Sequence, residues 1–248
     1  MKKQKETKPM TPLRAFFDKL IFSFYVIALV CAICFSSFVW FQKTYFVNYW
    51  VNGQSMWPTL NKDTKTADGI PFDDSTDRKS MNGAYDVDFI IGDTHQNILD
   101  GLKRFDIVVC KYSESDSFEK IKRIIALPGE TFYIDAIGED KEGNGTLHIL
   151  NNETGEFEVV AQPVEQWIIE HGKYPYEYAQ PFTLKENEYF VMGDNRAHSS
   201  DSRLNGPVTK DNIEAKAIAI VAKCRIIVPV GGSTYTPTDI DYDWPRFL

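Results

Sequence analysis

Hydrophobic and polar positions divide this 248-residue chain into one long apolar run and many short ones. The long run covers residues 20–41, which are 22 positions without a charged side chain. As a helix it would span about 33 Å at 1.5 Å per residue, close to the roughly 30 Å of a bilayer's hydrocarbon core. The pattern predicts a transmembrane anchor over 20–41. The alternatives are a long buried helix and a cleavable signal segment, whose apolar core is typically about 7–15 residues.

Basic side chains flank only one end of this apolar run. Residues 1–19 carry six basic and two acidic side chains, whereas Lys43 is the only basic residue between positions 42 and 61. Positively charged segments tend to stay on the cytoplasmic side of a membrane. We therefore predict a cytoplasmic tail over 1–19, a single crossing of the cell membrane, and a domain over 42–248 outside the cytoplasm. Aromatic residues just after the run would lie at the lipid surface, so the lipid bilayer is a predicted partner.

The remainder of the chain has a β pattern. Short runs rich in β-branched and aromatic residues alternate with Gly, Asn, Asp and Pro, which favours a mainly β fold with an antiparallel, barrel-like sheet or a sandwich. We expect strands at 44–51, 105–112, 118–127, 131–137, 146–150, 157–161, 188–193 and 217–230. The polar stretch 61–104 is interpreted as an acidic insertion, and the last 16 residues, from Ser233, as a loosely packed tail.

Composition and charge exclude several classes of function. A net charge of −8 provides no basic surplus for binding nucleic acid. The four histidines show no paired spacing typical of a zinc site, and the aspartates at 73–77 and 86–93 do not match an EF-hand loop. We therefore expect neither a metal nor another cofactor. Cys110 and Cys224 are interpreted as buried free thiols, with a disulfide as the alternative.

Two segments contain the residues of a nucleophile and a base. Ser55 lies in NGQSMWPTL (52–60), after a predicted strand, where a turn would present its hydroxyl. A serine is a weak nucleophile until a neighbouring base takes its proton. Lys122 lies among isoleucines in KIKRIIALPGE (120–130), where strand alternation could bury its amine. For Lys122 to act near pH 7–8, its pKa must fall about three units from roughly 10.4, about 4 kcal/mol, which burial can supply.

A third segment, MGDNRAHSSDSR (192–203), is dense in small, acidic and basic side chains. Ser199 could orient the lysine amine by a hydrogen bond, and the ion pairs of this segment would fix a turn. His198 raises the alternative of a Ser-His-Asp triad, although a histidine at such a place is more typical of a turn.

These three segments, in this order behind an N-terminal apolar run, resemble those of the type I signal peptidases, the membrane-bound Ser-Lys proteases. The resemblance covers 20–60, 105–137 and 188–227. It implies that Ser55 is the nucleophile, Lys122 the general base and Ser199 the residue that orients the lysine. It also implies a salt-bridged structural support beneath the site, formed by Arg123, Asp194, Arg196, Asp201 and Arg203.

The resemblance also implies a substrate and a mechanism. The expected function is a serine endopeptidase that removes signal peptides from exported preproteins by acyl transfer, cutting after small-x-small motifs near the export translocon. Positions that match the family's substrate pockets are Val51, Gly53, Met56, Leu60 and Ile121. Many Gram-negative members have a serine hydroxyl where this chain has Gly53, so the second oxyanion donor is unidentified. Other departures are Phe105, Ala126, Glu130, Ala197 and His198.

Two other classes of function remain open at this point. One is a related Ser-Lys protein that cleaves itself, but such proteins carry a DNA-binding unit and no export anchor. The other is a non-catalytic, membrane-tethered β domain that holds exported chains. The presence of Ser55, Lys122 and Ser199 together disfavours this second alternative.

Overall fold

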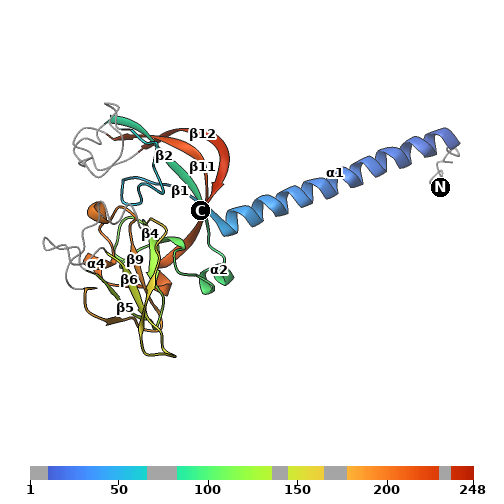
Figure 1. Cartoon of the computed structure of the whole chain (residues 1–248). Helices are drawn as coiled ribbons and strands as arrows, with labels where there is room; N and C mark the ends of the chain where they lie inside the picture. Colours follow the sequence, from blue (N-terminus) through green and yellow to red (C-terminus); the bar gives the residue numbers. More distant parts are fainter. Residues whose placement is uncertain (1–10, 66–82, 136–144, 165–177, 229–235) are drawn as a thin grey trace. The chain divides into compact units, whose positions relative to one another are not determined.

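A computed structural model of the chain describes residues 11–65, 83–135, 145–164, 178–228 and 236–248. The chain divides into two compact units, Met1–Tyr45 and Phe46–Leu248, and each is described separately (Figure 1).

The first unit contains one long helix, α1 (Pro12–Tyr45). It begins directly after Thr11, whose carbonyl accepts the first helical hydrogen bond from Ala15 N, and a proline suits the first position of a helix. Within Pro12–Gln42, an 18-residue window has a mean hydropathy of 2.4, which is compatible with a membrane span by length and composition. The helix is longer than the predicted 20–41, because the polar residues at both ends of the run also adopt helical backbone.

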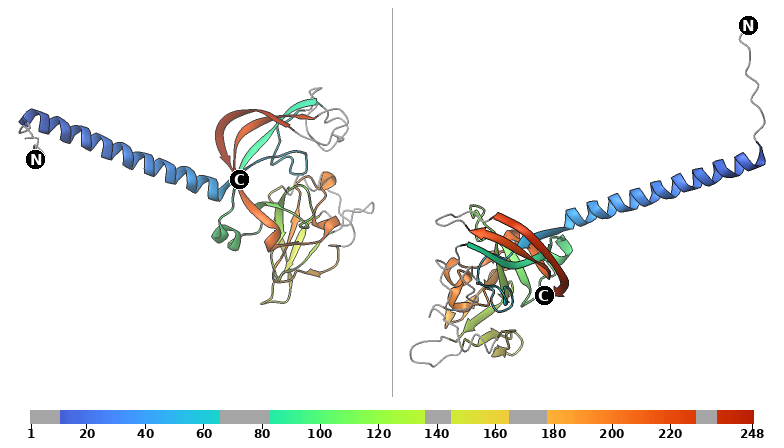
Figure 2. Two further views of the ribbon diagram at one scale, coloured as in Figure 1. Left: turned by 180° about the vertical axis from the view of Figure 1, so that it is seen from behind. Right: turned by 90° about the horizontal axis from the view of Figure 1, so that it is seen from above.

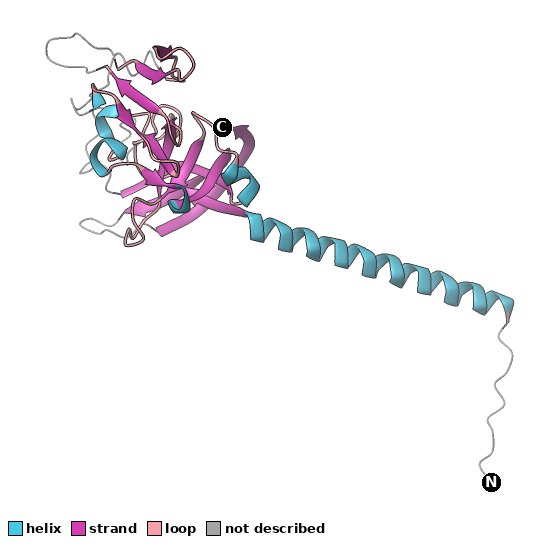
Figure 3. Cartoon of the chain, turned by 90° about the horizontal axis from the view of Figure 1, so that it is seen from below, coloured by secondary structure: helices cyan, strands magenta, loops and turns pink. Residues whose placement is uncertain are grey.

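The second unit is built on a curled antiparallel sheet, shown in magenta in Figure 3. Its strand order is β1-β2-β11-β3-β4-β9-β10, and β12 pairs with β11. These strands are β1 (Phe46–Trp50), β2 (Gly83–Asp93), β3 (Ile107–Cys110), β4 (Lys120–Ala126), β9 (Glu188–Met192), β10 (Val208–Thr209), β11 (Ile213–Val228) and β12 (Thr236–Phe247). The 16-residue β11 pairs with β3 through residues 213–216 and with β2 and β12 along most of the rest of its length, and its register shifts bend the sheet.

A smaller antiparallel sheet has the order β7-β6-β5-β8. Its strands are β5 (Thr131–Ile134), β6 (Leu147–Leu150), β7 (Phe157–Val160) and β8 (Phe182–Thr183). Strands β5, β6 and β7 belong to the part of the chain coloured yellow-green to yellow in Figure 2. A buried cluster joins this sheet to β4 and β9, and its centre is the ring pair Phe132 and Phe190, with centroids 4.8 Å apart. The second unit also contains the short helices α2 (Gln96–Asp100) and α4 (Ser202–Asn205).

The mainly β, antiparallel fold is confirmed, and each of the predicted strand regions contains an observed strand. Two expectations for the β domain are wrong. Residues 83–93, interpreted as part of an acidic insertion, form β2 inside the main sheet, and residues 236–247 form β12 rather than a loose tail. The rest of the polar stretch, 66–82, lies outside the described residues together with the acidic cluster 73–77.

The physical reason for the first error is the burial of acidic side chains in β2. Asp88 is fully buried and accepts a hydrogen bond from Lys223 Nζ at 2.6 Å, so its charge is compensated from the neighbouring strand β11. A local count of aspartates predicts solvent exposure and cannot reveal such a partner. The prediction for Cys110 and Cys224 is confirmed, since both are buried free thiols.

Candidate active site

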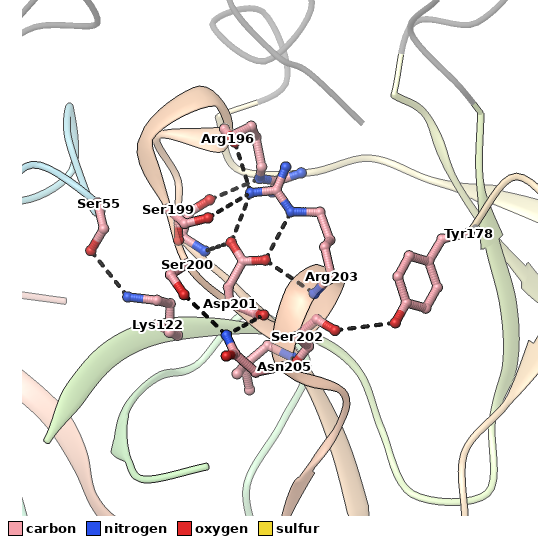
Figure 4. A network of polar contacts seen from close by, with 12 residues as sticks. Ser55, Lys122, Tyr178, Arg196, Ser199, Ser200, Asp201, Ser202, Arg203 and Asn205 are labelled. Atoms are coloured by element: carbon pink, nitrogen blue, oxygen red, sulfur yellow. Dashed lines mark hydrogen bonds and ion pairs between the residues drawn. The ribbon is translucent and has the colours of Figure 1, made fainter. Parts of the chain in front are cut away.

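Ser55 and Lys122 lie side by side in the β domain (Figure 4). Ser55 follows β1 in a tight turn, and Lys122 lies on β4, where it pairs with Val108 of β3. Ser55 Oγ and Lys122 Nζ are 3.1 Å apart, although 67 positions separate the two residues in sequence. This distance allows direct proton transfer between a hydroxyl and an amine.

Lys122 is in an environment that favours its neutral form. The residue is only 3% exposed, and its Nζ also donates to the carbonyl oxygen of Ile121 at 2.7 Å. Burial lowers the pKa of the Lys122 amine from its ordinary value of 10.5, because the charged form loses its hydration. The negative charges of Asp201 and Asp194 oppose this effect, but burial is the larger cause.

The turn that carries Ser55 is fixed by its backbone. Trp57 N donates to Gln54 O at 2.9 Å, and Asn195 N donates to Ser55 O at 3.1 Å. Gly53 has a φ of 112°, a conformation that side-chain-bearing residues rarely adopt. These contacts orient the hydroxyl of Ser55 towards Lys122 while the residue stays partly exposed.

An ion pair lies beside the lysine strand. Arg123, next to Lys122 on β4, donates through Nε and Nη2 to the two carboxylate oxygens of Asp194 at 2.8 and 2.7 Å. Arg123 Nη1 also donates to Phe105 O, and Thr59 Oγ1 donates to Asp194 Oδ2 at 2.5 Å. Since Thr59 belongs to the segment after Ser55, Asp194 connects the strand of the base to the segment of the nucleophile.

A second buried ion pair organises the loop that follows β9 (Figure 4). Asp201 accepts from Nε and Nη2 of Arg203, each at 2.8 Å, and from the backbone N–H of Gly193 at 3.0 Å. Arg203 Nη2 also donates to Arg196 O at 2.7 Å. Arg196 Nε donates to Gly193 O at 2.9 Å, and its Nη2 donates to Gln162 Oε1 at 2.9 Å. The five residues predicted as structural support therefore form two ion pairs and a linked arginine near Ser55 and Lys122. Their functional role stays a prediction.

Ser199 lies next to the dyad without a hydrogen bond to Lys122 in the part of the chain that the structure describes. It is 8% exposed, and its Oγ has no hydrogen-bond partner among those residues. Its proposed role in orienting the lysine stays a prediction. His198 ends a short 3₁₀ turn with an exposed side chain, and the basic group that contacts Ser55 is the lysine.

Gly193 is a positioning residue that the sequence reasoning missed. A Cβ atom at this position would overlap the carbonyl oxygen of Ser55 and the Oγ of Ser199. Only glycine lets the backbone after β9 approach the serine turn this closely. The signal in the sequence was a glycine directly before the acidic and basic cluster, but sequence alone does not show what it approaches.

Four of the predicted substrate-pocket residues belong to one apolar cluster. Val51, Met56 and Leu60 are buried in it, and Ile121 packs against it partly exposed. Met56 and Leu60 are fully buried, so they can form only the floor of a pocket, whereas Ile121 can reach a bound chain. The fifth residue, Gly53, faces open space, since no atom lies within 4 Å of where its Cβ would be. The binding role of all five stays a prediction.

Acidic, histidine and cysteine side chains do not gather into a metal site in the described ranges. No group of three or more of these residues could hold an ion there.

Comparison with known proteins identifies the family of the chain. Residues 20–222 match the family described as signal peptidase, peptidase S26. This match places the chain in the class of peptidases. The chain belongs to the signal peptidase family, peptidase S26.

Individual relatives show the extent of the similarity. Signal peptidase I of Pseudomonas aeruginosa is 27% identical over 162 residues, which cover 55% of this chain and 55% of that protein. The chain thus matches about half the length of this relative. Signal peptidase I S of Bacillus subtilis is 30% identical over 180 residues, covering 72% of this chain and 74% of that protein. A crystal structure of a signal peptidase I from Enterococcus faecalis V583 is 28% identical and covers 46% of this chain and 95% of that one, with a TM-score of 0.33.

Proposed function

We propose that this protein is a membrane-anchored serine endopeptidase that removes signal peptides from exported preproteins with a Ser55–Lys122 dyad. The observation that carries the proposal is the 3.1 Å contact between Ser55 Oγ and Nζ of a lysine that is only 3% exposed. Membership of the signal peptidase family supports the reaction and the class of substrate.

The mechanism follows from the neutral amine. Lys122 accepts the proton of Ser55, and the serine oxygen attacks the scissile carbonyl carbon to give a tetrahedral intermediate. The resulting ammonium of Lys122 then protonates the leaving amine, and the peptide C–N bond breaks to leave an acyl-enzyme. Lys122 next takes a proton from a water molecule, whose oxygen attacks the ester, and Ser55 regains its proton as the signal peptide leaves.

The developing oxyanion needs hydrogen-bond donors. The backbone N–H of Ser55 is the first donor, because it belongs to the attacking residue. Gly53 supplies no hydroxyl, so a second donor has to come from another group, for which a backbone amide and a water molecule are candidates. Where such a donor is needed, it contributes roughly 2.7–4 kcal/mol to transition-state stabilisation.

The apolar cluster beneath the turn that carries Ser55 would give the enzyme its specificity for small side chains. An extended substrate would lie between the segment ending at Gly53 and strand β4, and would add its backbone as a further strand. Because Met56 and Leu60 are fully buried, pockets above them are shallow and suit residues such as alanine. Ile121 would contact the substrate side chain directly.

Anchoring by α1 would place the reaction near lipid. We infer that the helix crosses the cell membrane once with residues 1–19 in the cytoplasm, because basic side chains precede it. A preprotein held in the same bilayer by its own apolar segment then meets the enzyme at a high effective concentration. The export translocon, which delivers such chains, is the expected neighbour.

Cleavage of a preprotein tests this proposal. The full chain in detergent micelles is incubated with a preprotein that ends its signal segment in Ala-x-Ala, alongside Ser55→Ala and Lys122→Met. We expect each variant to lose about 10⁴-fold or more in kcat/KM, while the control His198→Ala keeps the parental rate. A parent that binds the preprotein without cutting it would indicate the holding function. A parent that cuts only its own chain would indicate the self-cleaving alternative.

A further inference from the structure

Asn61 makes an unusual set of contacts with the segment that precedes the nucleophile. It lies six positions after Ser55 and is fully buried. Its Nδ2 donates to two backbone carbonyls, Val51 O at 2.7 Å and Gly53 O at 2.8 Å. Its Oδ1 accepts from the backbone N–H of Asp88 at 2.7 Å. Both polar atoms of this side-chain amide are therefore bonded to main chain.

Asp88 fixes Asn61 from the other side. The backbone N–H of Asn61 donates to Asp88 Oδ2 at 2.6 Å, and the N–H of Val51 donates to Asp88 O at 2.9 Å. Asp88 is fully buried on β2, and its charge is balanced by Lys223 of β11, with Nζ 2.6 Å away, and by Arg246 of β12 at 3.8 Å. The amide of Asn61 is thus held in one orientation by the main sheet.

The serine turn needs this restraint because of Gly53. A glycine with a φ of 112° and open space around it has access to many conformations. Trp57 and Asn195 hold the carbonyls of Gln54 and Ser55, as described above, but neither reaches the segment before Gln54. The Val51–Gly53 segment is also held by the bond from Val51 N to Asp88 O and by the bond from the Tyr85 hydroxyl to Asn52 Oδ1 at 3.0 Å. Of these contacts, only those of Asn61, to Val51 O and Gly53 O, include Gly53.

We propose that Asn61 is a positioning residue of the proposed peptidase: it holds the Val51–Gly53 segment so that Ser55 points at Lys122. Asn61 contacts neither substrate nor the reacting atoms and acts through the backbone. Its own φ of 60° lies in the left-handed region that asparagine tolerates better than most residues. An aspartate there would direct an oxygen at two carbonyl oxygens, and a glycine would keep the backbone but lose the contacts.

This inference rests on the proposed function. Two variants of Asn61 and a control at the next position distinguish a role in positioning Ser55 from a general role in the fold. Asn61→Gly removes the side chain at a φ that glycine adopts freely, and Asn61→Asp replaces the donor at constant size. The control is Lys62→Ala, because Lys62 is adjacent and exposed. Each full-length variant in detergent micelles is compared with the parent for preprotein cleavage across pH and for hydrogen exchange of residues 51–55.

We expect kcat to fall about 10- to 100-fold in both Asn61 variants with a smaller change in KM, since the nucleophile loses its orientation. The acid limb of the pH profile should not move, because the surroundings of Lys122 are intact. Amides of 51–55 should exchange at least tenfold faster, while those of β3 and β4 keep the parental rate. Lys62→Ala should behave as the parent in every respect.

Parental kcat together with parental exchange in Asn61→Gly would overturn the proposal. Faster exchange throughout β3, β4 and β9 would overturn it as well, because Asn61 would then support the fold in general. If the parent itself does not cleave a preprotein, the proposed function fails, and the exchange of 51–55 still decides whether Asn61 holds the turn.

Discussion

The two members of the dyad are held by different kinds of contact. Around Ser55 the contacts are mostly between neutral groups. The amide of Asn61 binds the carbonyls of Val51 and Gly53, and backbone N–H groups bind those of Gln54 and Ser55. Around Lys122 the surroundings are ionic, with Arg123 paired to Asp194 and Arg203 paired to Asp201. The contacts around Ser55 fix the direction of its backbone, and those around Lys122 control the charge of its amine.

The difference follows from what each group must do. A nucleophilic hydroxyl needs orientation, which short hydrogen bonds to the backbone provide. A lysine that acts as a base must be neutral, yet two carboxylates lie near it and raise its pKa. Each carboxylate is bound by an arginine through two hydrogen bonds, so much of its charge is compensated before it can act on Lys122.

The largest expected effect is on stability, from breaking an ion pair on the lysine side. Arg123→Met leaves Asp194, which is fully buried, without its partner, so the free energy of unfolding should fall by about 3–5 kcal/mol. Lys210→Met breaks an exposed pair with Asp100 at 2.7 Å and should cost less than about 1 kcal/mol. Denaturant unfolding of the full chain measures both. Equal losses would show that burial of the pair does not matter.

The next effect concerns Gly193, where the backbone after β9 comes close to both Ser55 and Ser199. Gly193→Ala forces Ser55 or Ser199 to move, and kcat/KM for preprotein cleavage should fall about 100-fold. Gly101→Ala is the matched control, since its Cβ would meet only two backbone carbonyls of α2, Asn97 O at 3.3 Å and Ile98 O at 3.8 Å. A Gly193→Ala enzyme with parental kinetics would contradict the close approach.

A smaller effect is expected on stability from the buried amine itself. Burial lowers the pKa of Lys122 in the folded state, so the unfolded chain binds more protons between the folded and the ordinary pKa. Stability should therefore rise with pH across that window in the parent. Lys122→Met removes this penalty and should be more stable than the parent at pH 7, with the gap narrowing as pH approaches about 10.4. A difference in the free energy of unfolding between Lys122→Met and the parent that stays constant with pH would show that the lowered pKa of Lys122 is not its cause.

The smallest effect is a shift of the pH profile. Asp201→Asn removes a negative charge that raises the pKa of Lys122, so that pKa should fall further. The acid limb of kcat/KM then moves to lower pH, because the amine is neutral over a wider range. Ser200→Ala, at an exposed neighbouring position, is the control. A shift of the acid limb to higher pH would mean that a group other than Lys122 controls it.

The sequence predicts the central pair and most of the sheet, because their signals are local. Ser55 and Lys122 each lie in a short motif, and the isoleucines around the lysine already indicate its burial. Residues 122–126 of β4 are all buried, so the expected alternation of exposed and buried positions does not occur there. Strand β2 and Asn61 could not be predicted in this way. The burial of Asp88 depends on Lys223, 135 positions away, and an asparagine in a polar stretch looks like any surface residue until its two carbonyl partners are seen.

The most direct test of the account is the pKa of Lys122 in the folded protein. The full chain, labelled with ¹³C at lysine Cε and held in detergent micelles, is titrated by NMR, and the Lys122 signal is assigned by its loss in Lys122→Met. The account predicts that this amine titrates well below the ordinary lysine value of 10.5. A Lys122 signal that titrates together with the exposed lysines would contradict it.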